Sequence, residues 1–448
     1  MSDTIAAIAT AHGVASISII RLSGPDAVRI ASQIAPGASF VPRYATLNDL
    51  LDSEGELIDR GLVLYFEAPR SFTGEDVVEF QAHGGLVVAE QILQSLRHHG
   101  ARLAEPGEFS KRAFLNGKID LSEAEAIARL IEAKSVDAAR ILARQLKGEL
   151  GRFVEESREA LLRALAHSEV MIDYAEEDIP ATLIEGLMRQ LEALRGRLER
   201  IVESSRRRRG LIEGFRVAIV GKPNVGKSSL LNALLSYERA IVSDVAGTTR
   251  DTIEEQIRIG SHIVRLIDTA GIREARDQVE RIGVERSLSS LEEADIVIAL
   301  FDASRPWDEE DEAILRLLEA ADHEEKELIV ALNKSDLPER IDTRKLEGIP
   351  FIRISARRRF QRLMELLQER LDRWATDEEL MLASARQIEA VERCASEIAA
   401  AMLPLQREEL ELFSYHIRAA LEAISQITRP FENDQVLDRM FGEFCLGK

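Results

Sequence analysis

One stretch of the sequence places glycines, a lysine and a serine between a strand pattern and a helix pattern. It comprises Gly221–Ser229, which follows the apolar run Phe215–Val220 and precedes the helix-like Leu230–Leu235. In this context the backbone N–H groups of the loop point inward, and the start of the next helix adds partial positive charge. We expect the Lys227 ammonium to reach the β- and γ-phosphates of a nucleotide and the Ser228 hydroxyl to ligate Mg²⁺. A plain glycine turn is the alternative, and the flanking strand and helix disfavour it.

Two later segments carry groups that suit the γ-phosphate and its metal ion. Within Val245–Asp251, the Thr249 hydroxyl is expected to ligate Mg²⁺ when this segment closes over the γ-phosphate. Asp268–Gly271 ends a predicted strand, where the Asp268 carboxylate suits a water-mediated Mg²⁺ contact and the Gly271 amide suits the γ-phosphate. Their order and spacing are typical of a GTPase.

The base of the nucleotide is predicted by Asn333–Asp336, which ends another predicted strand. The Asp336 carboxylate can accept hydrogen bonds from guanine N1–H and N2–H₂ together. Adenine offers neither donor there, and leaving a desolvated carboxylate unpaired discriminates by about 10⁴ or more. A backbone N–H of Ser355–Ala356 would then meet guanine O6. Together with the phosphate loop, these segments predict GTP rather than ATP.

Ile272 occupies the position at which small GTPases of the Ras type have a glutamine that orients the attacking water. Isoleucine can neither donate nor accept a hydrogen bond, so another residue must orient the water, or the protein is a slow switch that needs a partner. The candidates in the following segment are Arg273, Glu274, Asp277 and Glu280. Charge at the transition state could be neutralised by Arg250 in cis, or by a monovalent cation held by Asn224 and residues 243–249.

Charge and cysteine content restrict the partners and the compartment. The formal net charge of −20 argues against general binding of nucleic acid, but a local basic face would still allow RNA. Two such clusters are Arg206–Arg209 and Arg357–Arg359, for which solvated loop charge is the alternative. The chain has two distant cysteines, Cys394 and Cys445, which indicates neither a disulfide framework nor a zinc site and suits a reducing cytosol. No apolar run approaches the roughly 20 residues of a membrane helix, and we expect neither a membrane segment nor a signal peptide.

Changes in sequence texture divide the chain into four segments. Residues 1–118 mix short strands and helices, residues 119–210 and 376–448 show helical spacing, and residues 211–375 alternate strands and helices. Helices on both sides of the strand-bearing block favour its insertion into one helical bundle domain over a linear string of four domains. The expected fold class is multidomain α+β and α/β, with a Ras-like P-loop G domain inserted. The expected strands are Ala15–Arg21, Leu62–Phe66, Asp76–Phe80, Phe215–Val220, Thr252–Ile259, His262–Ile267, Ile296–Phe301, Leu328–Leu332 and Phe351–Ile354, and Leu86–His98 is expected to be a helix.

Several motifs resemble those of a known family. Lys222–Asn224 and Asp244–Asp251 are similar to the TrmE–Era–Der group of GTPases. The rest of the chain resembles the MnmE (TrmE) family of tRNA-modification GTPases over its whole length. The segments that carry this resemblance are Ser71–Glu79, His83–Gly85, Ala104–Lys118 and Phe444–Lys448.

The resemblance implies a reaction and its partners. Together with MnmG (GidA), which carries FAD and uses NADH, the family modifies C5 of the wobble uridine (U34) of certain tRNAs. An aminomethyl or carboxymethylaminomethyl group is added, and its one-carbon unit comes from a tetrahydrofolate derivative, the 5-formyl or 5,10-methylene form. The resemblance further implies a cytoplasmic homodimer, formed through an N-terminal tetrahydrofolate-binding domain, that assembles with MnmG into a heterotetramer.

The resemblance also implies roles for individual residues. Glu280 matches the family's water-positioning glutamate, and Cys445 matches a near-terminal cysteine that modification requires. The implied K⁺ ligands, across a GTP-dependent dimer of G domains, are Asn224, Ser243, Val245 and Thr248. The implied folate contacts are Arg21, Glu79, Lys118 and Lys448, each of which could instead form a salt bridge within its domain. The full set expected to bind GTP is Asn224, Val225, Gly226, Lys227, Ser228, Ser229, Ser243, Asp244, Val245, Ala246, Gly247, Thr248, Thr249, Asp268, Thr269, Ala270, Gly271, Asn333, Lys334, Asp336, Ser355 and Ala356.

Two other hypotheses compete with a modifying enzyme. One is an assembly switch of the Era or Der type, which acts on ribosomes without modification chemistry. The absence of a KH-type Gly-x-x-Gly segment after the G domain argues against it. The other is a folate-dependent one-carbon transferase in which GTP is only regulatory.

Overall fold

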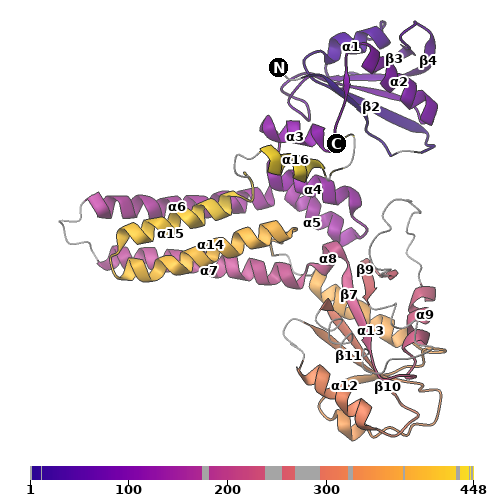
Figure 1. The fold of residues 1–448 in the computed structure, drawn as a ribbon, viewed down its shortest axis with the longest axis vertical. Helices are drawn as coiled ribbons and strands as arrows, with labels where there is room; N and C mark the ends of the chain where they lie inside the picture. Colours follow the sequence, from indigo (N-terminus) through magenta and orange to yellow (C-terminus); the bar gives the residue numbers. More distant parts are fainter. Residues whose placement is uncertain are drawn as a thin grey trace. The chain divides into compact units, whose positions relative to one another are not determined.

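A computed structural model of the chain describes residues 3–11, 13–173, 181–237, 255–267, 293–320, 326–376, 379–429, 434–442, 444 and 447. The chain divides into two compact units. Unit 1 comprises Met1–Ile131, Arg144–Leu194 and Ser396–Lys448, and unit 2 comprises Glu132–Ala143 and Arg195–Ala395. Each unit contains one six-stranded sheet (Figure 1).

The sheet of unit 1 has the strand order β3-β4-β5-β2-β1-β6. Its strands are β1 (Ile5–Ile8), β2 (Ile17–Ser23), β3 (Thr46–Leu51), β4 (Leu57–Phe66), β5 (Val77–His83) and β6 (Arg102–Leu103). Side chains alternate between the two faces, because successive residues of a strand point to opposite sides. Ile20, Leu22 and Phe80 are buried against the helices α1 (Ala27–Ile34) and α2 (Leu86–His98). The opposite face buries Ile5, Ala7 and Phe109, the last from α3 (Glu108–Leu115).

Helices that precede and follow the second sheet in sequence pack on each other in unit 1. The helices before that sheet are α4 (Leu121–Glu132), α5 (Val136–Leu146), α6 (Glu149–Asp173) and α7 (Ala181–Arg207), and those after it are α14 (Ala385–Gln406), α15 (Leu410–Ser425) and α16 (Asp434–Gly442). Most of α5, residues 195–207 of α7 and residues 385–395 of α14 belong to unit 2, and the rest of these helices belongs to unit 1. α6 lies beside α15 (Figure 1), where the buried Ser168 and Ser414 hydroxyls are 2.8 Å apart. Leu121 and Ala124 of α4 share a small core with Leu437 and Phe441 of α16.

The sheet of unit 2 has the order β12-β11-β10-β7-β9-β8, with every neighbouring pair parallel except β8 and β9. Its strands are β7 (Phe215–Val220), β8 (Glu255–Ile259), β9 (His262–Ile267), β10 (Ile296–Asp302), β11 (Glu327–Asn333) and β12 (Phe351–Arg353). The helices α8 (Gly210–Glu213), α9 (Lys227–Tyr237) and α13 (Gln361–Ala375) contribute to the core on one face, and α12 (Glu309–Ala320) covers the other. Because parallel strands end at the same edge, the loops after β7, β10, β11 and β12 meet there. The predicted α+β and α/β fold class is confirmed.

Residues 132–143, which include the start of α5, belong to unit 2 although they are distant from its sheet in the sequence. Ser261 and His262, at the turn between β8 and β9, contact Asp137 at the start of α5: the Ser261 hydroxyl donates to Asp137 at 2.8 Å, and His262 Nδ1 lies 3.5 Å from it. His262 is buried, and its Nε2 lies 2.8 Å from Asp372 of α13. The Phe215 ring stacks on Trp374 and meets the His262 ring edge-on. The hairpin β8–β9 is thus fixed both to α5 and to α13.

Candidate functional site

The loop between β7 and α9 is held closed by its own lysine. Lys227, the first residue of α9, donates from Nζ to the carbonyl oxygens of Gly221 at 2.6 Å and Lys222 at 2.9 Å. Asn224 has a φ of 62°, and Gly226 has a φ of 106°. A Cβ at Gly226 would lie 2.3 Å from Asn333 Nδ2, so this position requires glycine for close approach as well as for its backbone conformation.

Asn333 joins this loop to the loop after β12. It is 2% exposed, its Nδ2 donates to the Val225 carbonyl at 2.8 Å, and its Oδ1 accepts from the Ala356 amide at 2.9 Å. The neighbouring Lys334 donates to the Asn224 carbonyl at 2.8 Å and to Asp302 at 2.6 Å. The structure therefore brings together three segments that the sequence assigns separately to phosphate and base.

Asp302 is a site residue that the sequence reasoning missed. It ends β10, is 3% exposed, and also accepts from the Ser304 hydroxyl at 2.6 Å. Burial alone would raise the pKa of the Asp302 carboxyl, but hydrogen bonds from Lys334 and Ser304 outweigh it and lower the pKa. The sequence could have indicated it, because Asp302 ends an apolar strand and lies beside Asn333 of β11.

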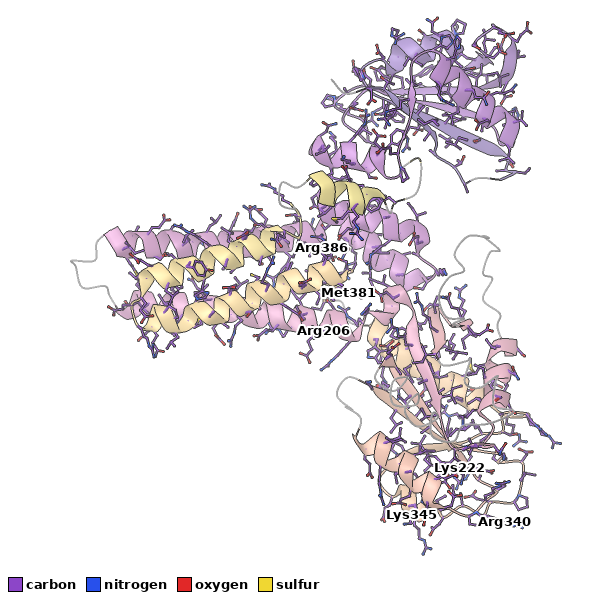
Figure 2. All side chains as sticks on the ribbon, viewed as in Figure 1. Arg206, Lys222, Arg340, Lys345, Met381 and Arg386 are labelled. Atoms are coloured by element: carbon purple, nitrogen blue, oxygen red, sulfur yellow. The ribbon has the colours of Figure 1, made fainter. Side chains whose placement is uncertain are left out.

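Lys222 is a second residue for which the sequence predicts no structural role. It is 6% exposed, and its Nζ lies 2.5 Å from Asp308 and 2.6 Å from Asp311, at the start of α12 (Figure 2). Burial alone would lower the pKa of Lys222, but the two carboxylates raise it, whereas burial raises the pKa of Asp311. These ion pairs connect the phosphate loop to α12, which covers the sheet face opposite to α9.

The groups expected to read the base lie at the same edge of the sheet. Asp336 is exposed, and the pKa of its carboxyl is lowered by the nearby Ser355 hydroxyl and its own backbone amide, with smaller contributions from Arg358 and Arg357. Ser355 and Ala356 are buried. The Asp336 carboxylate can accept two hydrogen bonds from guanine. The two amides predicted to meet guanine O6 donate within the protein, that of Ser355 to the Arg359 carbonyl at 2.9 Å and that of Ala356 to Asn333 Oδ1 at 2.9 Å.

Several predicted site residues lie outside the described residues. Of the GTP, Mg²⁺ and K⁺ sets these are Ser243, Asp244, Val245, Ala246, Gly247, Thr248, Thr249, Asp268, Thr269, Ala270 and Gly271. Ile272, Glu280, Arg250, Cys445 and Lys448 are also outside them. Their roles remain predictions.

Two of the predicted folate contacts form an ion pair in unit 1. Arg21 of β2 and Glu79 of β5 are cross-strand neighbours, and Arg21 Nε donates to Glu79 Oε1 at 2.8 Å. The Arg21 guanidinium lies 5.7 Å from the ring centroids of both Phe72 and Phe109. A Cβ at Gly74 would come within 3.2 Å of Lys118, which places Lys118 beside the loop that carries Phe72. The pair is a polar site over aromatic rings on one face of the sheet.

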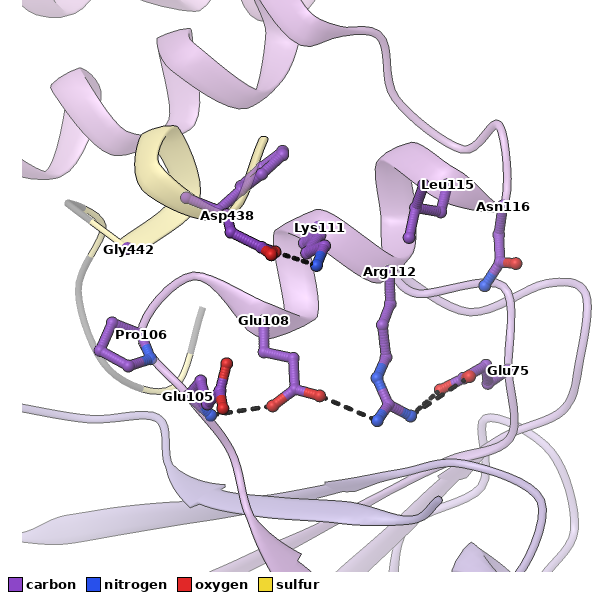
Figure 3. A pocket seen from close by; sticks show the side chains of 11 residues that line it. Glu75, Glu105, Pro106, Glu108, Lys111, Arg112, Leu115, Asn116, Asp438 and Gly442 are labelled. Carbon is purple, nitrogen blue, oxygen red and sulfur yellow. Dashed lines mark hydrogen bonds and ion pairs between the residues drawn. The ribbon is translucent and has the colours of Figure 1, made fainter. Parts of the chain in front are cut away.

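A separate cavity of about 380 Å³ lies between α3 and α16 (Figure 3). Arg112 is bound there by Glu75 and Glu108, and Lys111 forms an ion pair with Asp438 of α16. The lining residues are Glu75, Glu105, Pro106, Glu108, Lys111, Arg112, Leu115, Asn116, Asp438, Phe441 and Gly442. Arg21, Glu79 and Lys118 do not line it, so the predicted folate contacts and this cavity are different places.

Two glycines, Gly107 and Gly447, allow close contact between the C-terminal residues and the rest of unit 1. A Cβ at Gly107 would lie 2.2 Å from the Phe441 carbonyl oxygen, and one at Gly447 would lie 2.4 Å from the Ile8 carbonyl oxygen. Both glycines have positive φ, 68° and 89°. Gly447 therefore packs against β1, and Phe441 and Phe444 pack against the start of α3.

Two features are absent from the described part of the chain. None of its helices combines the length and apolar character that a membrane span requires. Nor do its His, Cys, Asp and Glu side chains form a group of three or more that could hold a metal ion.

Comparison with known proteins identifies the family. A model of the TrmE N-terminus matches residues 4–118, and a model of the MnmE helical domain matches residues 121–445. The tRNA modification GTPase MnmE of Sulfurovum sp. (strain NBC37-1) is 61% identical over 448 residues, covering 100% of this chain and 99% of the relative. The proteins of the same name from a Nitratiruptor species and from Sulfurimonas denitrificans are 58% and 56% identical, each over 100% of this chain and 99% of the relative. The resemblance seen in the motifs is confirmed, and the chain belongs to the MnmE (TrmE) family.

Proposed function

We propose that this chain is an enzyme that hydrolyses GTP and couples hydrolysis to the modification of tRNA. The observation that carries the GTPase half is Asn333, which hydrogen-bonds both to the phosphate loop and to the loop expected to meet guanine O6. Asp336 is exposed at the same sheet edge, with a carboxyl whose lowered pKa keeps it ionised and able to accept from guanine. The tRNA half is supported by the full-length similarity to proteins named tRNA modification GTPase.

In this proposal Ser228 and Thr249 ligate Mg²⁺, and Glu280 orients the attacking water in place of the glutamine that Ile272 replaces. Asn224, Ser243, Val245 and Thr248 hold K⁺, whose charge acts where other GTPases insert an arginine. The hydrogen bonding of Asn224 supports its proposed role as a K⁺ ligand. Its carbonyl oxygen accepts from Lys334, whereas its exposed side-chain amide has no hydrogen-bond partner in the described part of the chain.

The modification proposed is the addition of an aminomethyl or carboxymethylaminomethyl group to C5 of the wobble uridine. It takes place in the cytoplasm, in a heterotetramer of a homodimer of this chain with FAD-containing MnmG. A tetrahydrofolate derivative supplies the carbon. Arg21 and Glu79 are proposed to bind the folate together with Lys118 and Lys448, and Cys445 is proposed to act in the modification. The partly exposed Phe72 ring beside Arg21 supports this, since a planar pterin can stack on it.

The cation requirement gives the first prediction. GTP turnover by the full chain should be at least about 10-fold faster in K⁺ than in Na⁺ at equal ionic strength, because an arginine finger or its substitute contributes about 10³–10⁵ in rate. Phosphate release under saturating GTP measures it. Equal rates in the two salts would contradict the role proposed for K⁺.

Glu280→Ala is the matched variant for this experiment. It removes the water-positioning carboxylate and leaves the base and phosphate contacts in place. It should bind GTP with wild-type affinity and show low turnover in both cations. Wild-type turnover in K⁺ would remove Glu280 from its proposed role.

A further inference from the structure

The two arginine clusters of the sequence have different environments in unit 2. In the cluster Arg206–Arg209 every guanidinium is bound within the protein. The partners are Glu392 for Arg206 at 2.5 Å, Glu203 for Arg207, the Glu379 carbonyl for Arg208 at 2.7 Å, and Glu213 for Arg209 at 2.6 Å. Arg206 is at the end of α7 (Figure 2), and Arg208 is 4% exposed. This cluster stabilises the junction of α7, α8 and α14.

The cluster Arg357–Arg359 has no such partners. All three side chains are exposed, and within the described ranges none of them forms a hydrogen bond or an ion pair with a carboxylate or a carbonyl group. Arg358 and Arg357 act on Asp336 only through their charge, which helps to lower the pKa of its carboxyl. The same sequence pattern therefore corresponds to two environments. Arg206–Arg209 is paired within the protein, whereas the side chains of Arg357–Arg359 have no such partners in the described ranges.

The backbone holds these arginines close together on one tight turn. The Arg359 amide donates to the Ser355 carbonyl at 2.8 Å, the Ser355 amide donates to the Arg359 carbonyl at 2.9 Å, and the Arg358 amide donates to the Ser355 carbonyl at 3.0 Å. Three guanidinium groups on a closed turn repel one another, and bound anions relieve that repulsion. Guanidinium also matches phosphate in a bidentate geometry that lysine cannot make.

We propose that the Arg357–Arg359 turn contacts the phosphate backbone of tRNA, an inference that rests on the proposed function above. In a chain with a net charge of −20, a polyanion is repelled from most of the surface and can approach only where cations are free. An acidic protein fits less well, because protein interfaces have an apolar or aromatic centre. The turn offers none: Ala356 is buried and Phe360 is only partly exposed.

The turn also connects RNA contact to the nucleotide site. It begins at Ser355–Ala356, and the Ala356 amide is bound by Asn333, which in turn binds the phosphate loop. A tRNA phosphate on Arg357 or Arg358 thus lies next to the residues that read guanine. The contact is sequence-independent, since phosphates carry no base information.

The test is the salt dependence of tRNA binding by the full chain. Fluorescence anisotropy with an unmodified, labelled tRNA transcript is measured from about 50 to about 200 mM salt for wild type and for the triple variant Arg357→Gln, Arg358→Gln, Arg359→Gln. Each phosphate contact contributes roughly 0.7–0.9 to the slope of log K against log salt, so the slope should fall by about 2 to 3. The affinity at low salt should fall by about 10- to 100-fold.

The matched control is Arg206→Gln, Arg207→Gln, Arg209→Gln, which removes the same formal charge from the paired cluster. Its slope should stay at the wild-type value. An equal loss in both variants would assign the effect to net charge and overturn the proposal, as would a wild-type slope in the first variant. The single variant Arg359→Gln, which leaves the two arginines that act on Asp336 in place, should lower the slope by roughly 0.7–0.9 with unchanged binding of a fluorescent GDP. An unchanged slope there would also count against the proposal.

The failures of the two proposals are distinguishable. A wild-type chain that does not bind tRNA would refute the proposed function together with this inference. A wild-type chain that binds tRNA, with a triple variant that binds it equally well, would refute this inference alone. Loss of MnmG binding with retained tRNA binding would assign the turn to a protein partner instead.

Discussion

Asp336→Asn is expected to lower the affinity for GTP by roughly 10³-fold or more, the scale on which a site built for one hydrogen-bond pattern rejects another. In the proposed function the carboxylate accepts from guanine N1–H and N2–H₂, whereas asparagine presents an N–H₂ donor to the N2–H₂ donor. The same substitution should raise the affinity for XTP, because xanthine has a carbonyl oxygen at C2 that the new amide can bind. The hydrogen-bonding groups of xanthine would then match those of the variant side chain, and the phosphate contacts would be unchanged.

Competition against a fluorescently labelled GDP measures both affinities in one titration. Asp342→Asn is the matched control, because Asp342 is a partly exposed aspartate of the same loop whose partner is Arg344. It should leave the affinities for GTP and XTP at wild-type values. Unchanged GTP affinity in Asp336→Asn would show that this carboxylate does not read the base.

Asn333→Ala is expected to lower the free energy of unfolding of unit 2 by about 2–6 kcal/mol. The substitution leaves the Val225 carbonyl and the Ala356 amide without their partner, and each buried polar group left unsatisfied costs about 1–3 kcal/mol. The phosphate loop and the base-reading turn also lose their connection. GTP affinity should therefore fall together with stability.

Urea denaturation followed by fluorescence, and titration with labelled GDP, measure the two effects. Asn232→Ala is the control, because Asn232 is exposed on α9 and its side chain forms no hydrogen bond in the described ranges. It should change the free energy of unfolding by less than about 0.5 kcal/mol. A similarly small change for Asn333→Ala would mean that the loops are held by other contacts.

The strand–loop–helix pattern around Gly221–Ser229 was predictable because it is local. β7 and β9 have the bounds expected from their apolar runs, and α2 matches its predicted range. β4 begins at Leu57, five positions before the predicted strand. Its additional residues pair with β3, and an antiparallel pair tolerates polar residues such as Asp59 and Arg60 where one face meets solvent. Propensity alone places such residues in a loop.

Contacts between distant segments were not predictable in the same way. Lys222 meets Asp308 and Asp311 across more than eighty positions, and that pairing depends on the order of the strands between them. The same holds for Arg21 and Glu79, which the register of β2 on β5 brings together. The two arginine clusters show the limit most directly. Both are runs of arginine beside an element end, and only the surrounding acidic side chains distinguish them.

GTP hydrolysis by this chain is proposed to drive tRNA modification. Nucleoside analysis by mass spectrometry of tRNA from a strain that lacks the chain tests it most directly. C5-modified wobble uridines should be absent from that tRNA, restored by the wild-type chain, and not restored by Asp336→Asn. Normal wobble uridines in the strain that lacks the chain would contradict the account.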